Sequence, residues 1–246
     1  MSRLHRRLMQ VLLSDIVAGR LAAGTSLPRE TDLAAQFRVS RGVARECVRG
    51  LEERGLVTVK HGRGATVCPR EVWDLFNPEV LEAVLEGDGG AAVLGEYLEC
   101  RRLLEIEAAA LAAERARASD LSALSDALER RKAAAERAPD NTAAESLYHQ
   151  ADIDFHHAVI AATGNRALGR MTEPIHRALA MARRTLARPG LRIARSIPEH
   201  RRILTAIAAG DAAEARAAMH AHLATVEGYL REYAESLLEE EAPRRA

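Results

Sequence analysis

The sequence has few residues of the kinds that hold together disulfide-rich or membrane-spanning proteins. Among its 246 residues are three cysteines, three phenylalanines, four tyrosines and one tryptophan. The cysteines, Cys47, Cys68 and Cys100, have no paired spacing, which argues against a disulfide framework. There is no uncharged apolar run of roughly 18 residues, the length of a membrane span, and no recognisable signal sequence. We therefore expect a cytoplasmic protein with free thiols and no membrane partner.

Net charge is also absent, but only because two opposite charges cancel. The chain has 35 Lys and Arg against 35 Asp and Glu. Residues 1–68 hold 12 basic and 6 acidic residues, a formal charge of +6, and the remainder holds 23 and 29, a charge of −6. Only the amino-terminal part therefore suits a polyanion such as DNA. The length leaves enough chain for a second domain beyond it.

Two short helices joined by a tight turn are predicted in the basic region. An apolar segment from Leu33 to Phe37 forms the first helix, Arg38 to Ser40 the turn, and Arg41 to Leu51 the second helix. Such a pair forms a DNA-reading unit, because the second helix can lie in a major groove while the first crosses the backbone. The second helix carries three arginines at four-residue spacing, and hence on one face: Arg41, Arg45 and Arg49.

A β-hairpin with a basic tip is predicted directly after this helix. Leu56 to Val59 reads as one strand, His61 to Gly64 as the turn, and Ala65 to Val67 as the return strand. Glycines on both sides of Arg63 allow its backbone to approach a phosphate or enter a minor groove, with His61 as a second polar tip. A solvated basic helix face would explain the arginines alone, but it leaves this wing unexplained.

These residues resemble the winged-helix domain of GntR-type transcription regulators. The similarity is carried by Leu27–Glu30, Leu33–Phe37, Val39–Arg41, Val43–Glu46 and Leu51–Val57. The resemblance implies DNA contacts by Ser40, Arg41, Arg45, His61 and Gly62, and with Arg49 and Arg63 from the patterns above these form the candidate DNA-binding set. Thr31 and Gly42 depart from the family pattern, which usually has arginine and threonine at these positions. We expect these differences to change the operator sequence that is preferred more than the ability to bind DNA.

The rest of the chain is predicted to be helical. Ala, Leu, Glu and Arg recur at helical spacing over residues 91–237, with almost no β-branched runs. Breaks and caps predict six to seven helices there, with Gly210–Asp211 separating the last two. The expected fold class is thus mainly α, with a winged helix-turn-helix of three helices and a hairpin at 1–68, a linker at 69–90, a helical bundle at 91–237 and a disordered tail at 238–246.

Four residues of the helical region form a candidate metal-binding set. Asp152 and His156 lie four apart and share a helix face, so the two side chains can chelate one ion. His200 and His222 belong to helices that a short Gly-Asp turn folds back antiparallel. Three imidazoles and one carboxylate suit Zn, Ni, Co, Mn or Fe. Ordinary surface or core histidines are the competing interpretation, since the same region contains four further histidines close by.

The region also resembles the ligand-sensing domain of FadR-type GntR regulators. The similarity is carried by Arg101–Glu105, Ala108–Ala113, Asp152–His156, Thr163–Asn165, Glu199–Leu204, Gly210–Asp211 and His222–Leu223. In the metal-containing branch, the positions matching Asp152, His156, His200 and His222 hold a divalent metal, for which zinc is the first candidate. The position matching Arg101 faces the carboxylate of the ligand.

This resemblance has a coherent physical logic. Four protein ligands on a six-coordinate metal leave two positions for an acid's carboxylate and its neighbouring hydroxyl. A guanidinium such as that of Arg101 then binds the carboxylate through two parallel hydrogen bonds. The competing interpretation of Arg101 is an ion pair with Glu105, four residues further along the same helix.

A short connector adds an expectation about the ligand. Trp73 to Leu81 resembles regulators that respond to sugar acids such as aldonates and hexuronates, although a linker anchored to the helical domain by Trp73 and Phe76 would also explain it. We expect a homodimeric repressor that binds a pseudo-palindromic double-stranded operator and responds to a small carboxylic acid, such as a sugar acid, at a divalent metal.

Two other classes of protein remain open at this point. A metal-sensing regulator would use the same residues, with the ion itself as the signal. A metal-dependent hydrolase would use the ion to activate water, but no second acid or base has a telling spacing, and the winged helix would have no role. We therefore do not expect an enzyme.

Overall fold

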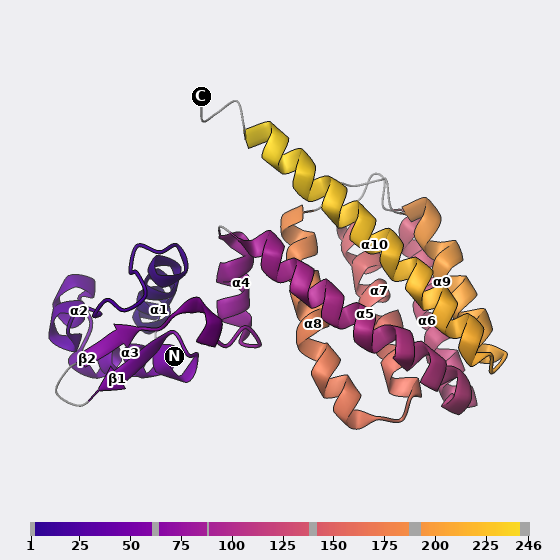
Figure 1. Cartoon of the computed structure of the whole chain (residues 1–246), viewed down its shortest axis with the longest axis horizontal. Helices are drawn as coiled ribbons and strands as arrows, with labels where there is room; N and C mark the ends of the chain where they lie inside the picture. The colour runs from indigo at the N-terminus through magenta and orange to yellow at the C-terminus, as the bar shows by residue number, and fades with distance from the viewer. Residues whose placement is uncertain (1–2, 61–63, 88, 138–141, 187–192, 242–246) are drawn as a thin grey trace. The chain divides into compact units, whose positions relative to one another are not determined.

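The computed structural model describes residues 3–60, 64–87, 89–137, 142–186 and 193–241. The chain divides into two units, Met1–Val93 and Leu94–Ala246 (Figure 1). Among the described helices, none has both the length and the apolar character needed to cross a membrane.

The first unit has the winged helix-turn-helix organisation predicted from the sequence. Helices α1 and α2 pack against α3, and β1 pairs antiparallel with β2 so that Val57 lies opposite Val67. Ser26 forms a further bridge to Thr66 beside this hairpin. The elements are α1 (Arg3–Val17), α2 (Glu30–Phe37), α3 (Arg41–Glu53), β1 (Val57–Lys60), β2 (Gly64–Val67), a 3-10 helix η1 (Arg70–Val72) and α4 (Pro78–Glu86).

The turn between α2 and α3 is formed by two local features. Arg38 adopts a left-handed conformation at φ 53°, which ends α2 and redirects the chain. Ser40 is the N-cap of α3, where its hydroxyl oxygen accepts a hydrogen bond from the Val43 amide at 3.2 Å. Both features fix the entry of α3, the predicted recognition helix.

The range 69–90, predicted as a linker, contains the short helices η1 and α4. Arg54 holds this segment, because its Nη2 donates to Glu79 Oε2 at 2.7 Å and its carbonyl accepts from the Asp74 amide at 3.0 Å. Helix α4 also packs against α1. The indole of Trp73 donates to the Cys68 carbonyl within this unit, and Phe76 is 66% exposed.

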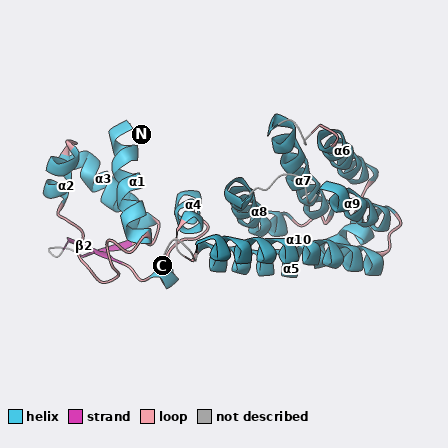
Figure 2. Ribbon diagram, turned by 90° about the horizontal axis from the view of Figure 1, so that it is seen from above, coloured by secondary structure: helices cyan, strands magenta, loops and turns pink. Residues whose placement is uncertain are grey.

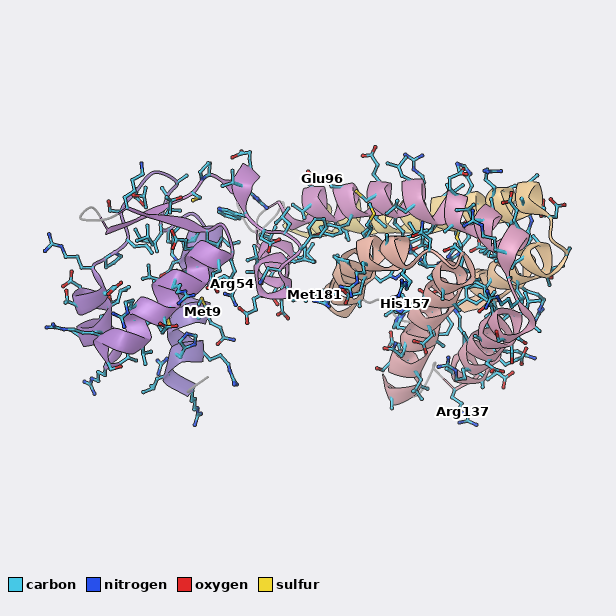
Figure 3. All side chains as sticks on the ribbon, turned by 90° about the horizontal axis from the view of Figure 1, so that it is seen from below. Met9, Arg54, Glu96, Arg137, His157 and Met181 are labelled. Carbon is cyan, nitrogen blue, oxygen red and sulfur yellow. The ribbon has the colours of Figure 1, made fainter. Side chains whose placement is uncertain are left out.

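Helices α1 and α3 approach each other closely near Arg54. Its Nη1 donates to the Gly50 carbonyl at 2.7 Å, and a Cβ at Gly50 would lie 2.5 Å from the Met9 methyl. Figure 3 labels Met9 and Arg54, which lie close together in the view of this unit. The absence of a side chain at Gly50 therefore lets α1 and α3 pack closely.

The second unit is a bundle of six helices, counted over the described residues. Figure 2 shows α5 and α10 along one side of the bundle, with α6, α7, α8 and α9 on the other. Two ion pairs, Arg102–Glu227 and Arg216–Glu107, join α5 to α10 in an antiparallel arrangement. The helices are α5 (Gly90–Arg115), α6 (Ala118–Ala135), α7 (Thr142–Ala162), α8 (Arg166–Leu186), α9 (Ile193–Ala208) and α10 (Ala212–Glu241).

Several helix ends lie where the sequence places them. Gly164 ends the α7 region at φ +68°, and Asn165 caps α8 by accepting from the Ala167 amide. Gly210 at φ +70° and Asp211, which caps α10, separate the last two helices. Helix α10 continues to Glu241 and so enters the range 238–246 predicted as a disordered tail. The run of Leu and Glu there consists of good helix formers.

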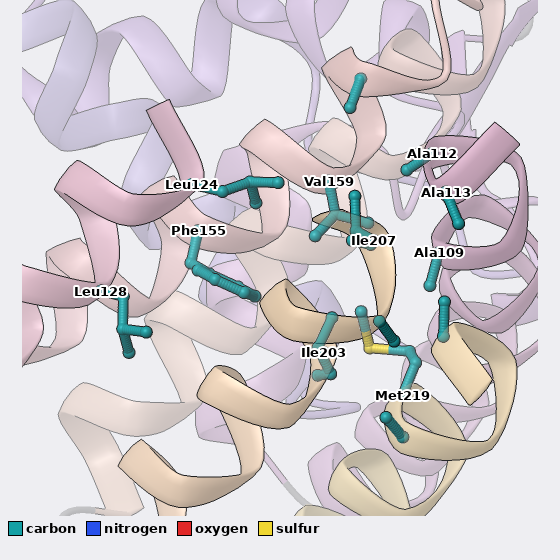
Figure 4. Close-up of a cluster of buried hydrophobic side chains, with 14 of the residues drawn as sticks. Ala109, Ala112, Ala113, Leu124, Leu128, Phe155, Val159, Ile203, Ile207 and Met219 are labelled. Carbon is teal, nitrogen blue, oxygen red and sulfur yellow. The ribbon is translucent and has the colours of Figure 1, made fainter. Parts of the chain in front are cut away.

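Alanine replaces aromatics in the core of the bundle. Small side chains on α5 let the neighbouring helices approach closely, and Phe155 fills the wider space beside α6 and α9. Figure 4 shows this cluster, whose labelled members are Ala109, Ala112, Ala113, Leu124, Leu128, Phe155, Val159, Ile203, Ile207 and Met219. The core fixes α7, α9 and α10 against one another and thereby positions the candidate site.

Candidate metal centre

The structure brings together the four residues predicted as metal ligands. Helix α7 supplies Asp152 and His156, α9 supplies His200 and α10 supplies His222. All four side chains are buried, and one ligand atom from each lies within 4.8 Å of the others. Two metal–nitrogen bonds of about 2.1 Å span at most about 4.2 Å, when the two ligands lie on opposite sides of the ion, so the widest separation would have to close by roughly 0.6 Å or more.

Two of the three histidines of this cluster have a hydrogen-bond acceptor on the outer nitrogen, and the third has an ion-pair contact there. The Nδ1 atom of His200 lies 2.7 Å from the Ser196 carbonyl, and that of His222 lies 2.8 Å from Glu199 Oε2. His156 Nδ1 lies 2.6 Å from Glu105 Oε2. A proton held on Nδ1 leaves the lone pair on Nε2, and Nε2 of His200 and of His156 lie 3.1 and 3.9 Å from Asp152 Oδ1.

The inner nitrogens fit a metal ion. Among the described residues, Nε2 of His156 and Nε2 of His222 are buried and have no hydrogen-bond partner. A buried lone pair without a partner is unfavourable, and a divalent cation would satisfy both at once. Together with the carboxylate of Asp152, 3.1 Å from His200 Nε2, the donor set is the one that borderline divalent metals bind.

The electrostatics keep these imidazoles neutral near neutral pH. Burial lowers the pKa of His156 and of His200 well below the ordinary value, although Glu105 opposes this effect at His156. Burial also lowers the pKa of His222 to about 4, even with the hydrogen bond to Glu199 acting in the other direction. Neutral imidazole is the form that binds a metal, so the site needs no deprotonation step at pH 7.

Glu105 lies beside the cluster, and from the sequence it is expected only as an ion-pair partner of Arg101. Its buried carboxylate contacts Arg101 Nε at 2.8 Å, His176 Nε2 at 2.7 Å and His156. Burial alone would raise the pKa of Glu105, but Arg101, His156 and His176 hold it well below its usual range. His176, on α8, is one of the four further histidines of this region, and its spacing in the sequence carries no metal-ligand signal.

Arg101 is one of the largest fully buried side chains that the structure describes. It forms the expected pair with Glu105, and its side chain is 2% exposed. Its Nη1 atom is nevertheless buried without a hydrogen-bond partner among the described residues. The ion pair therefore orients the guanidinium while one of its nitrogens stays available to an acceptor oxygen.

A second buried guanidinium, which sequence reasoning missed, reaches the cluster from α6. Arg131 Nη1 contacts Asp152 Oδ1 and lies 2.7 Å from His200 Nε2. Its Nη2 donates to the Tyr148 hydroxyl at 2.9 Å and contacts the Ser196 hydroxyl. The guanidinium also lies over the Tyr148 ring, 4.4 Å from its centroid.

The candidate DNA-binding residues lie on the first unit, where the structure describes four of the seven. Arg41, Arg45 and Arg49 are exposed on α3, and Ser40 is exposed at its start. Arg49 pairs with Glu53 at 3.2 Å, but both side chains are more than 60% exposed, so this pair is weak. The predicted wing tip, His61, Gly62 and Arg63, lies outside the described residues.

A winged helix-turn-helix is a DNA-binding architecture, and in this chain it is followed by a helical bundle with a buried polar site. Comparison with protein families gives the same result. Residues 4–67 match the bacterial regulatory proteins of the gntR family, and residues 96–225 match the FCD domain. The chain therefore belongs to the GntR family of transcription regulators, in the FadR-type group that carries this second domain.

The chain is similar to curated transcription regulators over most of their length. The chain is 33% identical to the galactonate operon transcriptional repressor of Escherichia coli K12, over 85% of this chain and 89% of that protein. It is 33% identical to the regulator LutR of Bacillus subtilis 168 (88% and 96%) and 32% identical to the Uxu operon regulator of Haemophilus influenzae (92% and 81%). These relatives confirm the prediction of a regulator rather than an enzyme.

Solved structures share the fold at low sequence identity. The structure of Lar from Listeria monocytogenes is 19% identical, with a TM-score of 0.55 and coverage of 96% of this chain and 99% of that one. E. coli McbR/YncC is 20% identical, with a TM-score of 0.50 and coverage of 94% and 99%. At this identity the likeness concerns the fold alone.

Proposed function

We propose that this regulator is a metabolite-responsive repressor whose operator binding is modulated by a small carboxylic acid held at a divalent metal. One observation carries the proposal. Three buried histidines offer ligand atoms that lie within 4.8 Å of one another and of one from Asp152, and Nδ1 of His200 and of His222 each has an acceptor on the outer side. Metal-binding histidines are typically oriented by such outer acceptors. Zinc is the first candidate for the ion, and Ni, Mn, Co and Fe suit the same donors.

The acid is proposed from the groups beside the cluster. A six-coordinate ion held by four protein ligands has two positions for an acid's carboxylate and adjacent hydroxyl. The free Nη1 of Arg101 is a suitable donor to that carboxylate. Two relatives are named for galactonate and Uxu operons, which supports a sugar acid as the class of effector.

The DNA partner is proposed to be a pseudo-palindromic double-stranded operator read by a homodimer. Ser40, Arg41, Arg45 and Arg49 would contact it from α3, and His61, Gly62 and Arg63 from the wing. Two readers joined through their second units would respond to the acid if it changed the spacing between them.

The test begins with DNA fragments selected from a random pool by binding to the full-length protein. Sugar acids, hydroxy acids and dicarboxylates are then titrated into the protein–DNA complex, with Zn²⁺ present or with a chelator. The proposal predicts that one class of acid changes DNA affinity only when Zn²⁺ is present. Regulation by Zn²⁺ with no organic acid would instead identify a metal sensor, and an acid response unaffected by chelator would overturn the metal-bridged effector site.

A matched pair of variants controls this test. His222→Gln removes a buried ligand, whereas His220→Gln changes an exposed residue two positions away on the same helix. The response to acid is expected to disappear in the first variant and to persist in the second. Loss in both, or in neither, would contradict the assigned role of His222.

A further inference from the structure

Arg131 contacts two of the four atoms that a bound metal would need. Its Nη1 contacts Asp152 Oδ1 and lies 2.7 Å from Nε2 of His200. The Nδ1 atom of His200 lies 2.7 Å from the Ser196 carbonyl oxygen and so carries the ring proton. The unprotonated Nε2 is therefore the acceptor in the contact with the guanidinium. The N–H groups of Arg131 therefore use the same lone pairs that a metal ion would use.

A guanidinium is always charged at physiological pH and cannot leave as a neutral group. Neutral His200 has a single lone pair, on Nε2, so an ion that binds this nitrogen must displace Arg131 from it. The chain thus contains its own cation for this centre, and the two cations exclude each other at Nε2 of His200 while they compete for the charge of Asp152.

We propose that Arg131 is a tethered competitor of the divalent ion, which sets the metal affinity of the centre and then becomes a second anion-binding group for the acid. The proposal rests on the metal-bound acid proposed above. Arg131 stays in the buried centre after the exchange, because Tyr148 and Ser196 hold its Nη2 and the Tyr148 ring lies beneath it. The carboxylate of the acid replaces Asp152 as the counter-ion of the guanidinium.

The acid would then meet guanidinium groups from two helices. Arg101 of α5 reaches the centre beside Glu105 and His156, and Arg131 of α6 reaches it beside Asp152 and His200. Metal and acid therefore bind cooperatively in this account, because the ion releases Arg131 and the acid stabilises the released form.

The experiment measures Zn²⁺ affinity of the full-length protein by competition with a chromophoric chelator. Arg131→Met should tighten Zn²⁺ binding by about tenfold or more, since hydrogen bonds to charged groups are lost on forming the metal site only in the wild type. A purely structural role predicts the opposite, because loss of the contacts to Tyr148 and Ser196 would loosen the cluster. Unchanged or weaker Zn²⁺ binding in a folded Arg131→Met protein would overturn the proposal.

A second readout is the affinity of the Zn²⁺-loaded protein for the acid that shifts its DNA binding, with D-galactonate as the first probe. Arg131→Met should weaken this affinity by about tenfold, in the direction opposite to its effect on Zn²⁺. Arg131→Lys keeps the charge with a single donor group and should lie between the wild type and Arg131→Met in both measurements. Acid binding equal to the wild type in Arg131→Met would contradict the second role.

The matched control is Arg130→Met. Arg130 is the preceding residue of α6, and its exposed side chain pairs with Asp154 at 2.6 Å. This variant should leave both constants unchanged, and thermal melting checks that each variant is folded. If the wild type binds no Zn²⁺ at all, the proposed function itself fails; if it binds Zn²⁺ and acid while Arg131→Met changes neither constant, only the role of Arg131 fails.

Discussion

His156 Nδ1 lies 2.6 Å from Glu105 Oε2, and both side chains are 1% exposed. Through its other oxygen the same carboxylate contacts Arg101 Nε at 2.8 Å. Glu105 therefore joins a proposed metal ligand to the guanidinium proposed to bind the acid. A shift of His156 or of Arg101 therefore changes the environment of the other residue, because the buried carboxylate of Glu105 has to remain paired with both.

The first prediction concerns Arg101. In Arg101→Met, acid affinity of the Zn²⁺-loaded protein should fall by about tenfold or more, because a charge-assisted hydrogen bond is lost, while Zn²⁺ binding persists. The variant should also melt at a lower temperature, since Glu105 loses one buried partner. Arg102→Met is the control, because Arg102 is partly exposed and pairs only at 3.7 Å with Glu227. Equal loss of acid binding in both variants would contradict the assignment.

The second prediction is acid lability of the chelated protein. The folded pKa of His222 is lowered from 6.5 to about 4, so the unfolded chain binds a proton that the folded chain does not bind in this interval. The contribution of His222 to the free energy of unfolding is therefore fully present above pH 6.5. It is lost as the pH falls from 6.5 towards 4, and the loss amounts to about 3 kcal/mol. Urea unfolding at several pH values, with chelator present, measures the slope.

His222→Gln provides the comparison for this slope. The variant should depend less steeply on pH between 6.5 and 4, because the titrating group is absent, whereas His220→Gln should follow the wild type. A slope in His222→Gln as steep as that of the wild type would show that other groups govern acid unfolding.

The third prediction tests the packing of η1 on the first unit. Gly55 has φ +70°, and a Cβ there would lie 2.5 Å from the Val72 carbonyl oxygen. Gly55→Ala should therefore destabilise the protein by more than the ~1–2 kcal/mol of a left-handed alanine alone. Gly19→Ala is the matched control, with φ +72° and nothing within 4 Å of its Cβ. Chemical unfolding should give Gly55→Ala a much lower free energy of unfolding than Gly19→Ala. Equal free energies of unfolding would refute the close contact.

The fourth prediction concerns the recognition helix. Arg45→Ala should weaken binding to the selected DNA by about 1 to 3 kcal/mol and relax the preference at the base pair that it reads. Arg20→Ala removes an equal charge from the same unit, but Arg20 pairs with Asp15 at the end of α1. Binding and repeated selection are compared for both. An unchanged sequence preference in Arg45→Ala would remove its role in base reading.

Local sequence signals predicted much of the fold. The apolar spacing before Arg38, the cap at Ser40 and the glycines near the wing depend on short-range geometry, and the winged helix-turn-helix follows from them. The helix in the supposed linker was missed because α4 spans only nine residues and is held by Arg54 and by α1. A short helix that depends on tertiary contacts carries little periodic signal of its own.

The candidate site shows the same division. Asp152 and His156 share a helix face by spacing, and the turn at Gly210–Asp211 made the approach of two more histidines predictable. Arg131 and His176 reach the centre from other helices, 69 residues from His200 and 71 residues from Glu105 respectively. Their roles depend on how the bundle packs, and no spacing rule in a single sequence encodes that packing.

The most direct test of the account is a calorimetric titration of sugar acids, D-galactonate first, into the full-length protein loaded with Zn²⁺ and into the same protein after chelation. The account predicts that at least one acid binds the loaded protein, and that this binding disappears on chelation and in His222→Gln but survives in His220→Gln. An acid that binds the chelated protein and His222→Gln as tightly as the loaded wild type would contradict a metal-bridged effector site.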